Sequence, residues 1–189
     1  MNRLGNIGNR KLFTLLATLV LGLVTTVQAP PLSAPARSAG APASTTPQYY
    51  PLVRVVDGDT IVVKINSKNV KVRLIGLDTP ELVDPRRPVQ CFAKEASIEM
   101  RTLVDGQDVR LETDPSQDTY DKYGRLLAYV YRPLDSKREE LLVNEYMISE
   151  GFGHEYTYNL PYKYQKEFRA AEKNARAGGK GLWGPGVCK

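Results

Sequence analysis

Two aspartates lie where a metal ion could be bound. Asp59 ends the sequence DGD, and Asp78 follows the apolar run LIGL. Two carboxylates that approach each other repel, and a bound cation removes that repulsion. Carboxylate oxygens without a nearby histidine or cysteine favour Ca²⁺ or Mg²⁺ over zinc or copper. Asp59 and Asp78 are therefore candidate metal ligands, although each of them alone also suits a turn or a cap.

Two arginines and one further acid would complete a site for a phosphodiester. Arg73 and Arg125 are candidates because each guanidinium can donate two hydrogen bonds to phosphate oxygens. Glu81 stands three residues after Asp78 in a loop, from which its carboxylate could reach a metal-bound water. Each of these residues alone also fits a solvated surface position. Together they permit a metal-assisted phosphodiesterase without proving one.

Aromatic side chains follow the charged ones. Tyr123, and one or both of Tyr156 and Tyr158, could stack on a base or bind a phosphate. The chain has 11 tyrosines, so packing is the default role for any one of them. The single histidine, His154, fits a surface or hydrogen-bonded position better than the role of general base.

Short strands and three helices would position these residues. Two β-branched runs flank the Asp57-Gly58 turn, which predicts a hairpin. Strands are predicted in two runs between 52 and 65, at 70–74, at 109–112 and at 126–131. Helical spacing of apolar residues predicts helices at about 93–103, 140–150 and 162–177. This order predicts an α+β fold, mainly β, with a five-stranded OB-type barrel and three α-helices.

The beginning of the chain has the features of an export signal. Residues 1–29 start with basic residues and contain an apolar run of 13 residues, Leu12–Val24. A bilayer span needs about 20 residues, so a signal peptide is expected, with an uncleaved membrane anchor as the alternative. Residues 30–48 are rich in Pro, Ala and Ser, which predicts a flexible spacer. Residues 49–189 are then the folded domain.

The net charge of +5 depends mainly on that leader. Residues 1–29 hold 3 of the 26 Lys and Arg and no acid, so the remainder carries 23 basic and 21 acidic residues, or +2. A balance this close to zero does not by itself indicate a nucleic-acid partner. Only the local placement of charge can do so.

The two cysteines, Cys91 and Cys188, predict one disulfide in an exported chain. Closing a loop of about 100 residues stabilises a fold by roughly 4–5 kcal/mol in the chain-entropy model. Two free thiols are the alternative. Two cysteines and one histidine do not make a zinc site.

Several motifs in one order resemble the thermonuclease family, the staphylococcal-nuclease-like enzymes, in its exported bacterial type. They are DGDT (57–60), RLIGLDTPE (73–81), DKYGR (121–125), NEYMISEGFG (144–153) and GKGLWG (179–184). DGDT alone is weak, whereas the combination in this order is specific. The resemblance covers about residues 50–185.

The resemblance implies an OB-type barrel that acts as an endonuclease and hydrolyses phosphodiester bonds of DNA and RNA with Ca²⁺. The implied calcium ligands are the carboxylates of Asp59 and Asp78 and the backbone carbonyl of Thr79. The implied catalytic residues are Glu81 as the base and Arg73 and Arg125 as stabilisers of the phosphoryl transition state. Lys122 and Tyr123 would contact a terminal phosphate, and the register leaves open which of Tyr156 and Tyr158 faces the site.

We expect a secreted or periplasmic protein that is a monomer, with no protein partner and with membrane attachment only if the leader stays uncleaved. Two other classes remain open. A non-catalytic nucleic-acid-binding barrel is disfavoured because all five charged site residues are present. An oligosaccharide-binding barrel would not require both arginines.

Overall fold

The structure is a computed structural model that describes residues 47–134 and 139–188. The expected signal peptide at 1–29 and nearly all of the expected spacer at 30–48 lie outside these residues. Within the two described ranges, no helix has the length and apolar character needed to cross a bilayer.

Five strands close into a barrel. They are β1 (Tyr49–Asp57), β2 (Thr60–Ile65), β3 (Lys68–Leu74), β5 (Asp108–Glu112) and β6 (Leu126–Pro133). They follow the order β3-β2-β1-β5-β6, and β3 pairs again with β6, which closes the sheet. The β3–β6 pairing is parallel and the other pairings in the barrel are antiparallel. The expected OB-type barrel is confirmed.

The first three strands form where the sequence predicts them. Asp57 pairs with Thr60 across the first turn. The second turn is tight, because Asn66 and Ser67 both adopt positive φ, 48° and 64°. Alternation along the strands places Val72 and Leu74 in the core, and this leaves the side chain of Arg73 on the opposite face of β3.

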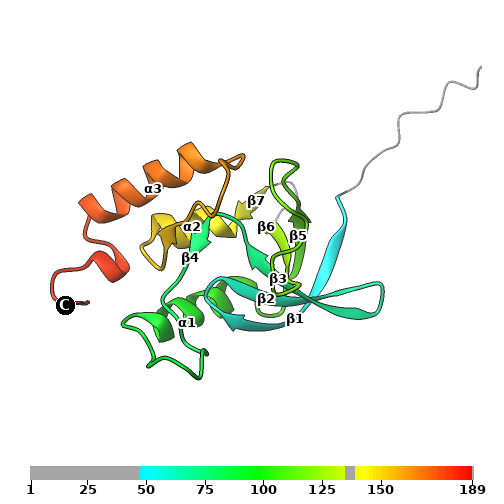
Figure 1. The fold of residues 1–189 in the computed structure, drawn as a ribbon, viewed down its shortest axis with the longest axis horizontal. Coiled ribbons are helices and arrows are strands. Elements are labelled where there is room, and N and C mark those ends of the chain that lie inside the picture. Colours follow the sequence, from blue (N-terminus) through cyan, green and yellow to red (C-terminus); the bar gives the residue numbers. More distant parts are fainter. Residues whose placement is uncertain (1–46, 135–138, 189) are drawn as a thin grey trace, which may run out of the picture. The chain divides into compact units, whose positions relative to one another are not determined.

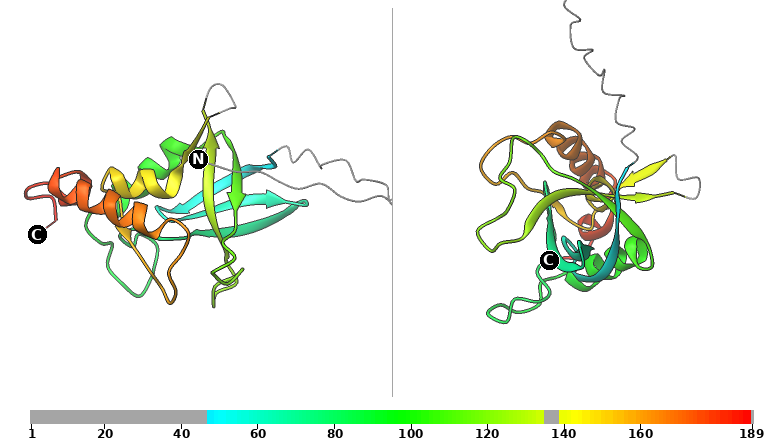
Figure 2. Two further views of the ribbon diagram at one scale, coloured as in Figure 1. Left: turned by 90° about the horizontal axis from the view of Figure 1, so that it is seen from above. Right: turned by 90° about the vertical axis from the view of Figure 1, so that its right-hand side faces the viewer.

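Three α-helices lie to one side of the strands, as both Figure 1 and the left view of Figure 2 show. They are α1 (Ala93–Val104), α2 (Val143–Ser149) and α3 (Gln165–Ala177), and α2 packs against α3. A short 3-10 turn, η1 (Gly181–Trp183), follows α3. The core beneath the helices includes fully buried Phe168 and Tyr129.

Two details differ from the expected pattern. The helix expected at 140–150 begins as a strand, β7 (Glu140–Leu142), and only seven residues become α2. The reason is the open edge of β6, where Tyr131 pairs with Leu142 and supplies backbone partners. A two-stranded sheet of β4 (Leu77–Asp78) and β8 (His154–Glu155) is too short to have been predicted.

Candidate active site

A groove of about 750 Å³ opens beside the barrel. Its lining comes from β3 and β4, from the segments around 115–127 and 156–162, and from Arg87. Charged and aromatic site candidates line it together: Arg73, Asp78, Lys122, Tyr123, Arg125, Tyr156 and Tyr158. The structure therefore brings together residues that are more than 80 positions apart in the chain.

Arg73 links the two candidate metal ligands. Its Nη2 donates a 2.8 Å hydrogen bond to Asp78 Oδ1 and lies 3.2 Å from Asp59 Oδ2. Its Nη1 donates to the backbone carbonyls of Leu74 and Leu77, which fixes the guanidinium at the end of β3. The positive charge of Arg73 thus balances two carboxylates that would otherwise repel each other.

Asp59 is buried and held from two sides. Thr60 Oγ1 donates to Asp59 Oδ1 at 2.8 Å, and the backbone N–H of Thr79 donates to Asp59 Oδ2 at 3.1 Å. Burial raises the pKa of Asp78, and the nearby charge of Asp59 raises it further, against the opposing effect of Arg73. Both carboxylates therefore occupy a site that favours additional positive charge.

The donor set here fits a hard divalent cation. Two carboxylates lie beside Thr79, whose backbone already touches Asp59, and all the candidate donors are oxygens. Among the described residues, no group of three or more His, Cys, Asp or Glu side chains is placed to hold a metal. Waters and a backbone carbonyl would have to complete the coordination shell, as is common for Ca²⁺.

Glu81 extends from the loop that follows β4. Its Oε1 accepts hydrogen bonds from the backbone N–H groups of Val83 (2.8 Å) and Asp84 (3.0 Å). Among the described residues, no donor engages its Oε2. The negative charge of Glu81 also contributes to raising the pKa of Asp78, so the two carboxylates are close enough to interact.

Asp57 is a buried acid close to Asp59 and Glu81, and sequence reasoning missed it. It is buried, and it accepts hydrogen bonds from the N–H groups of Gly58 (2.8 Å) and Leu82 (3.3 Å). Burial raises its pKa to about 6, and the charges of Asp59 and Glu81 add to the effect, while the two hydrogen bonds oppose it. The available signal is the first acid of DGDT, which the hairpin pattern explains fully as a turn residue.

Arg125 is oriented by Asp121, the first residue of the DKYGR motif. Asp121 Oδ2 accepts from Arg125 Nε at 2.6 Å, and its Oδ1 accepts the backbone N–H groups of Tyr123 and Arg125, both at 2.9 Å. Arg125 Nη1 lies 3.5 Å from Thr60 Oγ1, the group that also binds Asp59. Thr60 therefore connects Arg125 to Asp59.

The three candidate tyrosines line the groove and are exposed to solvent: Tyr123, Tyr156 and Tyr158. Lys122 Nζ lies 5.2 Å from the centre of the Tyr123 ring, which is 68% exposed. The rings of Tyr156 and Tyr158 are 6.3 Å apart, and both side chains are exposed. The structure therefore places both of these tyrosines at the groove and does not separate their roles.

His154 belongs to a packing cluster. Its Nδ1 lies 3.4 Å from Glu172, and its ring meets Trp183 edge-on at 4.8 Å. The side chain is 41% exposed, as expected for a histidine at the surface.

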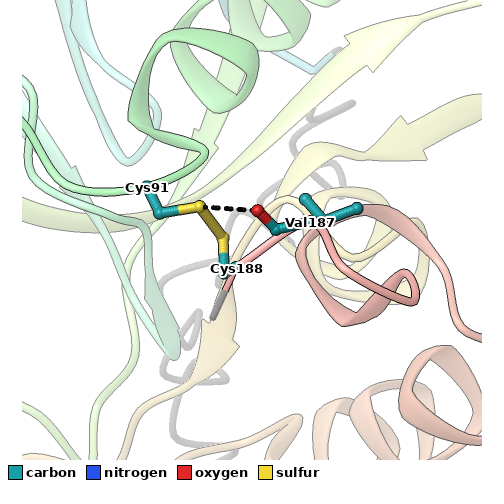
Figure 3. The surroundings of a disulfide bond; sticks show 3 residues. All are labelled: Cys91, Val187 and Cys188. Atoms are coloured by element: carbon teal, nitrogen blue, oxygen red, sulfur yellow. Dashed lines mark hydrogen bonds between the residues drawn. A yellow bond between two sulfur atoms is a disulfide. The ribbon is translucent and has the colours of Figure 1, made fainter.

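The expected disulfide is confirmed: Cys91 and Cys188 are bonded, with their Cα atoms 5.8 Å apart (Figure 3). It connects the loop that carries Glu81 to the C-terminal segment. In the same loop, Arg86 is paired with Asp84, while Arg87 lines the groove.

The chain is similar to known proteins over nearly all of this region. The model of the family described as "Staphylococcal nuclease homologue" matches residues 71–185. The thermonuclease of Staphylococcus hyicus is 38% identical over 85% of this chain and 90% of its own length. The thermonuclease of Staphylococcus intermedius is 37% identical over 72% of this chain and 76% of its own length. Endonuclease YncB of Bacillus subtilis is 40% identical over 70% of this chain and 60% of its own length. The chain therefore belongs to the family of staphylococcal nuclease homologues.

Proposed function

We propose that this chain is a Ca²⁺-dependent endonuclease that cleaves DNA and RNA, with Glu81 as the base and with Arg73 and Arg125 stabilising the transition state. Its family membership makes it a nuclease, a hydrolase of phosphodiester bonds in nucleic acids. The observation that supports the finer proposal is the convergence of Arg73, Asp78 and Arg125 at one groove, with Asp59 buried beside it in contact with Arg73.

Asp59, Asp78 and the carbonyl of Thr79 would hold the metal. The chemistry that Ca²⁺ supplies when bound is polarisation of the phosphoryl group and orientation of a water molecule. Glu81 would take the proton of the attacking water on Oε2, because Oε1 is already engaged by two backbone N–H groups. Both of its oxygens then have a defined task.

The arginines act on the phosphate. Arg73 and Arg125 would donate to the equatorial oxygens, where negative charge grows during in-line attack. Lys122 and Tyr123 would bind a terminal phosphate of the bound strand, and Tyr156 and Tyr158 would stack on its bases. Base stacking tolerates any sequence, which fits action on both DNA and RNA.

A cleavage assay with the purified protein tests this function. We expect nicking of supercoiled plasmid and degradation of RNA in Ca²⁺, and loss of both in chelator. Glu81→Gln is expected to lower the rate by about 10²–10⁴-fold, the usual contribution of a general base. Its Ca²⁺ affinity should stay near that of the parent. Glu167→Gln, at an exposed site on α3, is the matched control and should cleave normally.

Two outcomes would overturn the proposal. Nucleic acid that is bound but never cut in Ca²⁺ would indicate a binding barrel. Parental rates for Glu81→Gln would remove Glu81 as the base.

We also propose that the protein is exported as a monomer and acts in the periplasm or the medium. The basic start and the apolar run of 13 residues support export, and the disulfide suits an oxidising compartment. Sequencing the N-terminus of the protein from culture fractions tests this. A mature chain that begins at Met1 in the cytoplasm would contradict it.

A further inference from the structure

We propose that Gln90 is a positioning residue for Glu81, and that the Cys91–Cys188 disulfide fixes Gln90 in turn, so that full activity requires the oxidised protein. This inference rests on the proposed role of Glu81 as the base. It concerns the loop from Thr79 to Phe92, called here the Glu81 loop.

Gln90 closes the Glu81 loop with two hydrogen bonds. The backbone N–H of Glu81 donates to Gln90 Oε1 at 2.7 Å. The backbone N–H of Gln90 donates back to the carbonyl of Glu81 at 3.0 Å. Both bonds act on the main chain of Glu81, so they fix the point from which its carboxylate extends.

The other contacts of this loop are mostly local: Glu81 Oε1 accepts from the N–H groups of Val83 and Asp84, and the ring of Phe92 stacks on Phe152 at 5.7 Å. The described segment 79–92 contains no helix or strand. Its two valines are turned to solvent, with Val83 and Val89 each 52% exposed, so they add little apolar packing. Asp57 holds the loop near its start, through the N–H of Leu82. A segment with so few buried contacts depends on its individual hydrogen bonds and covalent links.

The disulfide supplies the link at the other end. Cys91 follows Gln90 directly, and its Sγ lies 3.3 Å from the carbonyl oxygen of Val187 (Figure 3). This is a contact and not a hydrogen bond, because a disulfide sulfur carries no proton. Loss of the covalent bond would free Gln90 from the C-terminal segment.

The C-terminal segment is itself firmly anchored. The N–H of Leu182 donates to the carbonyl of Gly151 at 2.9 Å. Arg176 stacks on the ring of Trp183 at 3.7 Å. The disulfide therefore ties the exposed end of the Glu81 loop to a part of the molecule that is fixed against α3 and the end of α2.

A reductant in solution can reach the Cys91–Cys188 disulfide, because both cysteines are exposed. A dithiol reductant supplies the two electrons and two protons that turn the disulfide into two thiols, and is itself oxidised to a disulfide. No other bond changes. The predicted consequence is a displaced Glu81 with Asp59, Asp78 and the two arginines still in place, since those lie outside the loop. Thr79, at the start of the loop, is still held by its N–H bond to Asp59.

Kinetics on four proteins tests the proposal: the parent with and without dithiothreitol, Cys91→Ser/Cys188→Ser, Gln90→Leu and Gln90→Glu. We expect kcat to fall by about 10–10²-fold after reduction, in the double serine variant and in Gln90→Leu, the size of effect that a misplaced group produces. KM and Ca²⁺ affinity should change little. Gln90→Glu keeps the oxygen that accepts from the N–H of Glu81, so its kcat should stay close to that of the parent and well above that of Gln90→Leu.

A double-mutant cycle separates this inference from the proposed function. If Gln90 acts through Glu81, Gln90→Leu should cause no further loss in a Glu81→Gln background. Inactive Glu81→Gln beside fully active Gln90→Leu and serine variants overturns this inference alone, whereas active Glu81→Gln overturns the proposed function. Equal losses in kcat, Ca²⁺ affinity and thermal stability would indicate general loosening and would also overturn the inference. If the serine variant fails to fold, reduction of the folded parent gives the same comparison.

Discussion

Arg73 Nη2 donates a hydrogen bond of 2.8 Å to Asp78 Oδ1. The sequence motifs predict different ligands for the two residues, a phosphate for Arg73 and a metal ion for Asp78. The same guanidinium reaches Asp59 at 3.2 Å. In this structure, the arginine therefore acts as the counter-ion of both candidate metal-binding carboxylates. Binding of a cation would take over that task and free the guanidinium for phosphate.

Replacement of Arg73 should separate these two tasks. Arg73→Gln removes a positive charge from two carboxylates, so a divalent cation should bind more tightly, by about 30-fold if each of the two lost contacts is worth about 1 kcal/mol. The cleavage rate should fall by about 10²–10³-fold, since one stabilising donor is lost from the transition state. Calorimetric titration with Ca²⁺ and a rate assay measure the two effects. Weaker Ca²⁺ binding would show instead that Arg73 holds the carboxylates in place.

Asp121 should matter for catalysis although it touches no expected metal ligand. Burial raises its pKa, but hydrogen bonds from Arg125 and Tyr123 outweigh that effect and leave the pKa lowered. Asp121→Asn removes the charge that orients Arg125, and we expect kcat to fall by about 10-fold or more, by analogy with other misplaced groups. Single-turnover cleavage measures the effect. Asp108→Asn, at an exposed position of β5, is the control, and equal rates in the two variants would contradict the prediction.

The motifs select residues that stand at the end of a predicted strand or in a loop beside one, and the structure places them near one another; their catalytic and metal-binding roles stay predictions. Arg73, Asp59 and Arg125 are identifiable from residue type and order, and all of them lie near the same rim. The contacts between them could not be predicted. Arg73 meets Asp59 because β2 and β3 pair with Arg73 opposite Thr60. The approach of Arg125 to Thr60 depends on barrel closure through the β3–β6 pairing, which joins segments about 50 residues apart.

The miss in the last predicted strand-to-helix boundary comes from strand pairing. The segment 140–142 has helical spacing but becomes β7, because the free edge of β6 offers backbone partners. The role of Gln90 was equally invisible, since an exposed glutamine in a loop carries no signal until its partner Glu81 is placed.

Acid should weaken the fold partly through Asp114, which is buried. Burial raises its pKa, but donors that include Lys163 N (2.8 Å), Tyr129 Oη (2.7 Å) and Ser116 N (2.9 Å) outweigh this, so its pKa is lowered. A lowered pKa means that the carboxylate stabilises the fold above the unfolded value of about 3.9, and that this contribution is lost as pH falls through the folded value.

Asp114→Asn should therefore cost about 1–3 kcal/mol at pH 7, the usual loss for a disturbed buried hydrogen-bond group. Below pH 4 the difference from the parent should shrink. Urea unfolding at pH 7 and at pH 3.5 measures both values. An equal difference at the two pH values would mean that the charge of Asp114 makes no contribution.

The close approach of Gly151 and Gly181 should be sensitive to a single methyl group. Gly151 has φ +77°, and a Cβ there would lie 2.3 Å from the carbonyl oxygen of Lys180. Gly151→Ala therefore meets both a left-handed backbone and rigid backbone atoms. Gly106 is a matched control, because it has φ +73° and a Cβ added there would meet no atom within 4 Å.

Gly106→Ala should cost about 1–2 kcal/mol, the strain of the left-handed conformation alone. Gly151→Ala should cost clearly more, because the C-terminal segment must also move away from α2. That movement pulls on the segment that the disulfide joins to the Glu81 loop, so kcat should fall in Gly151→Ala and stay unchanged in Gly106→Ala. Urea unfolding and cleavage rates on both variants measure these effects. Equal stability losses in the two would show that the contact between Gly151 and the C-terminal segment yields without cost.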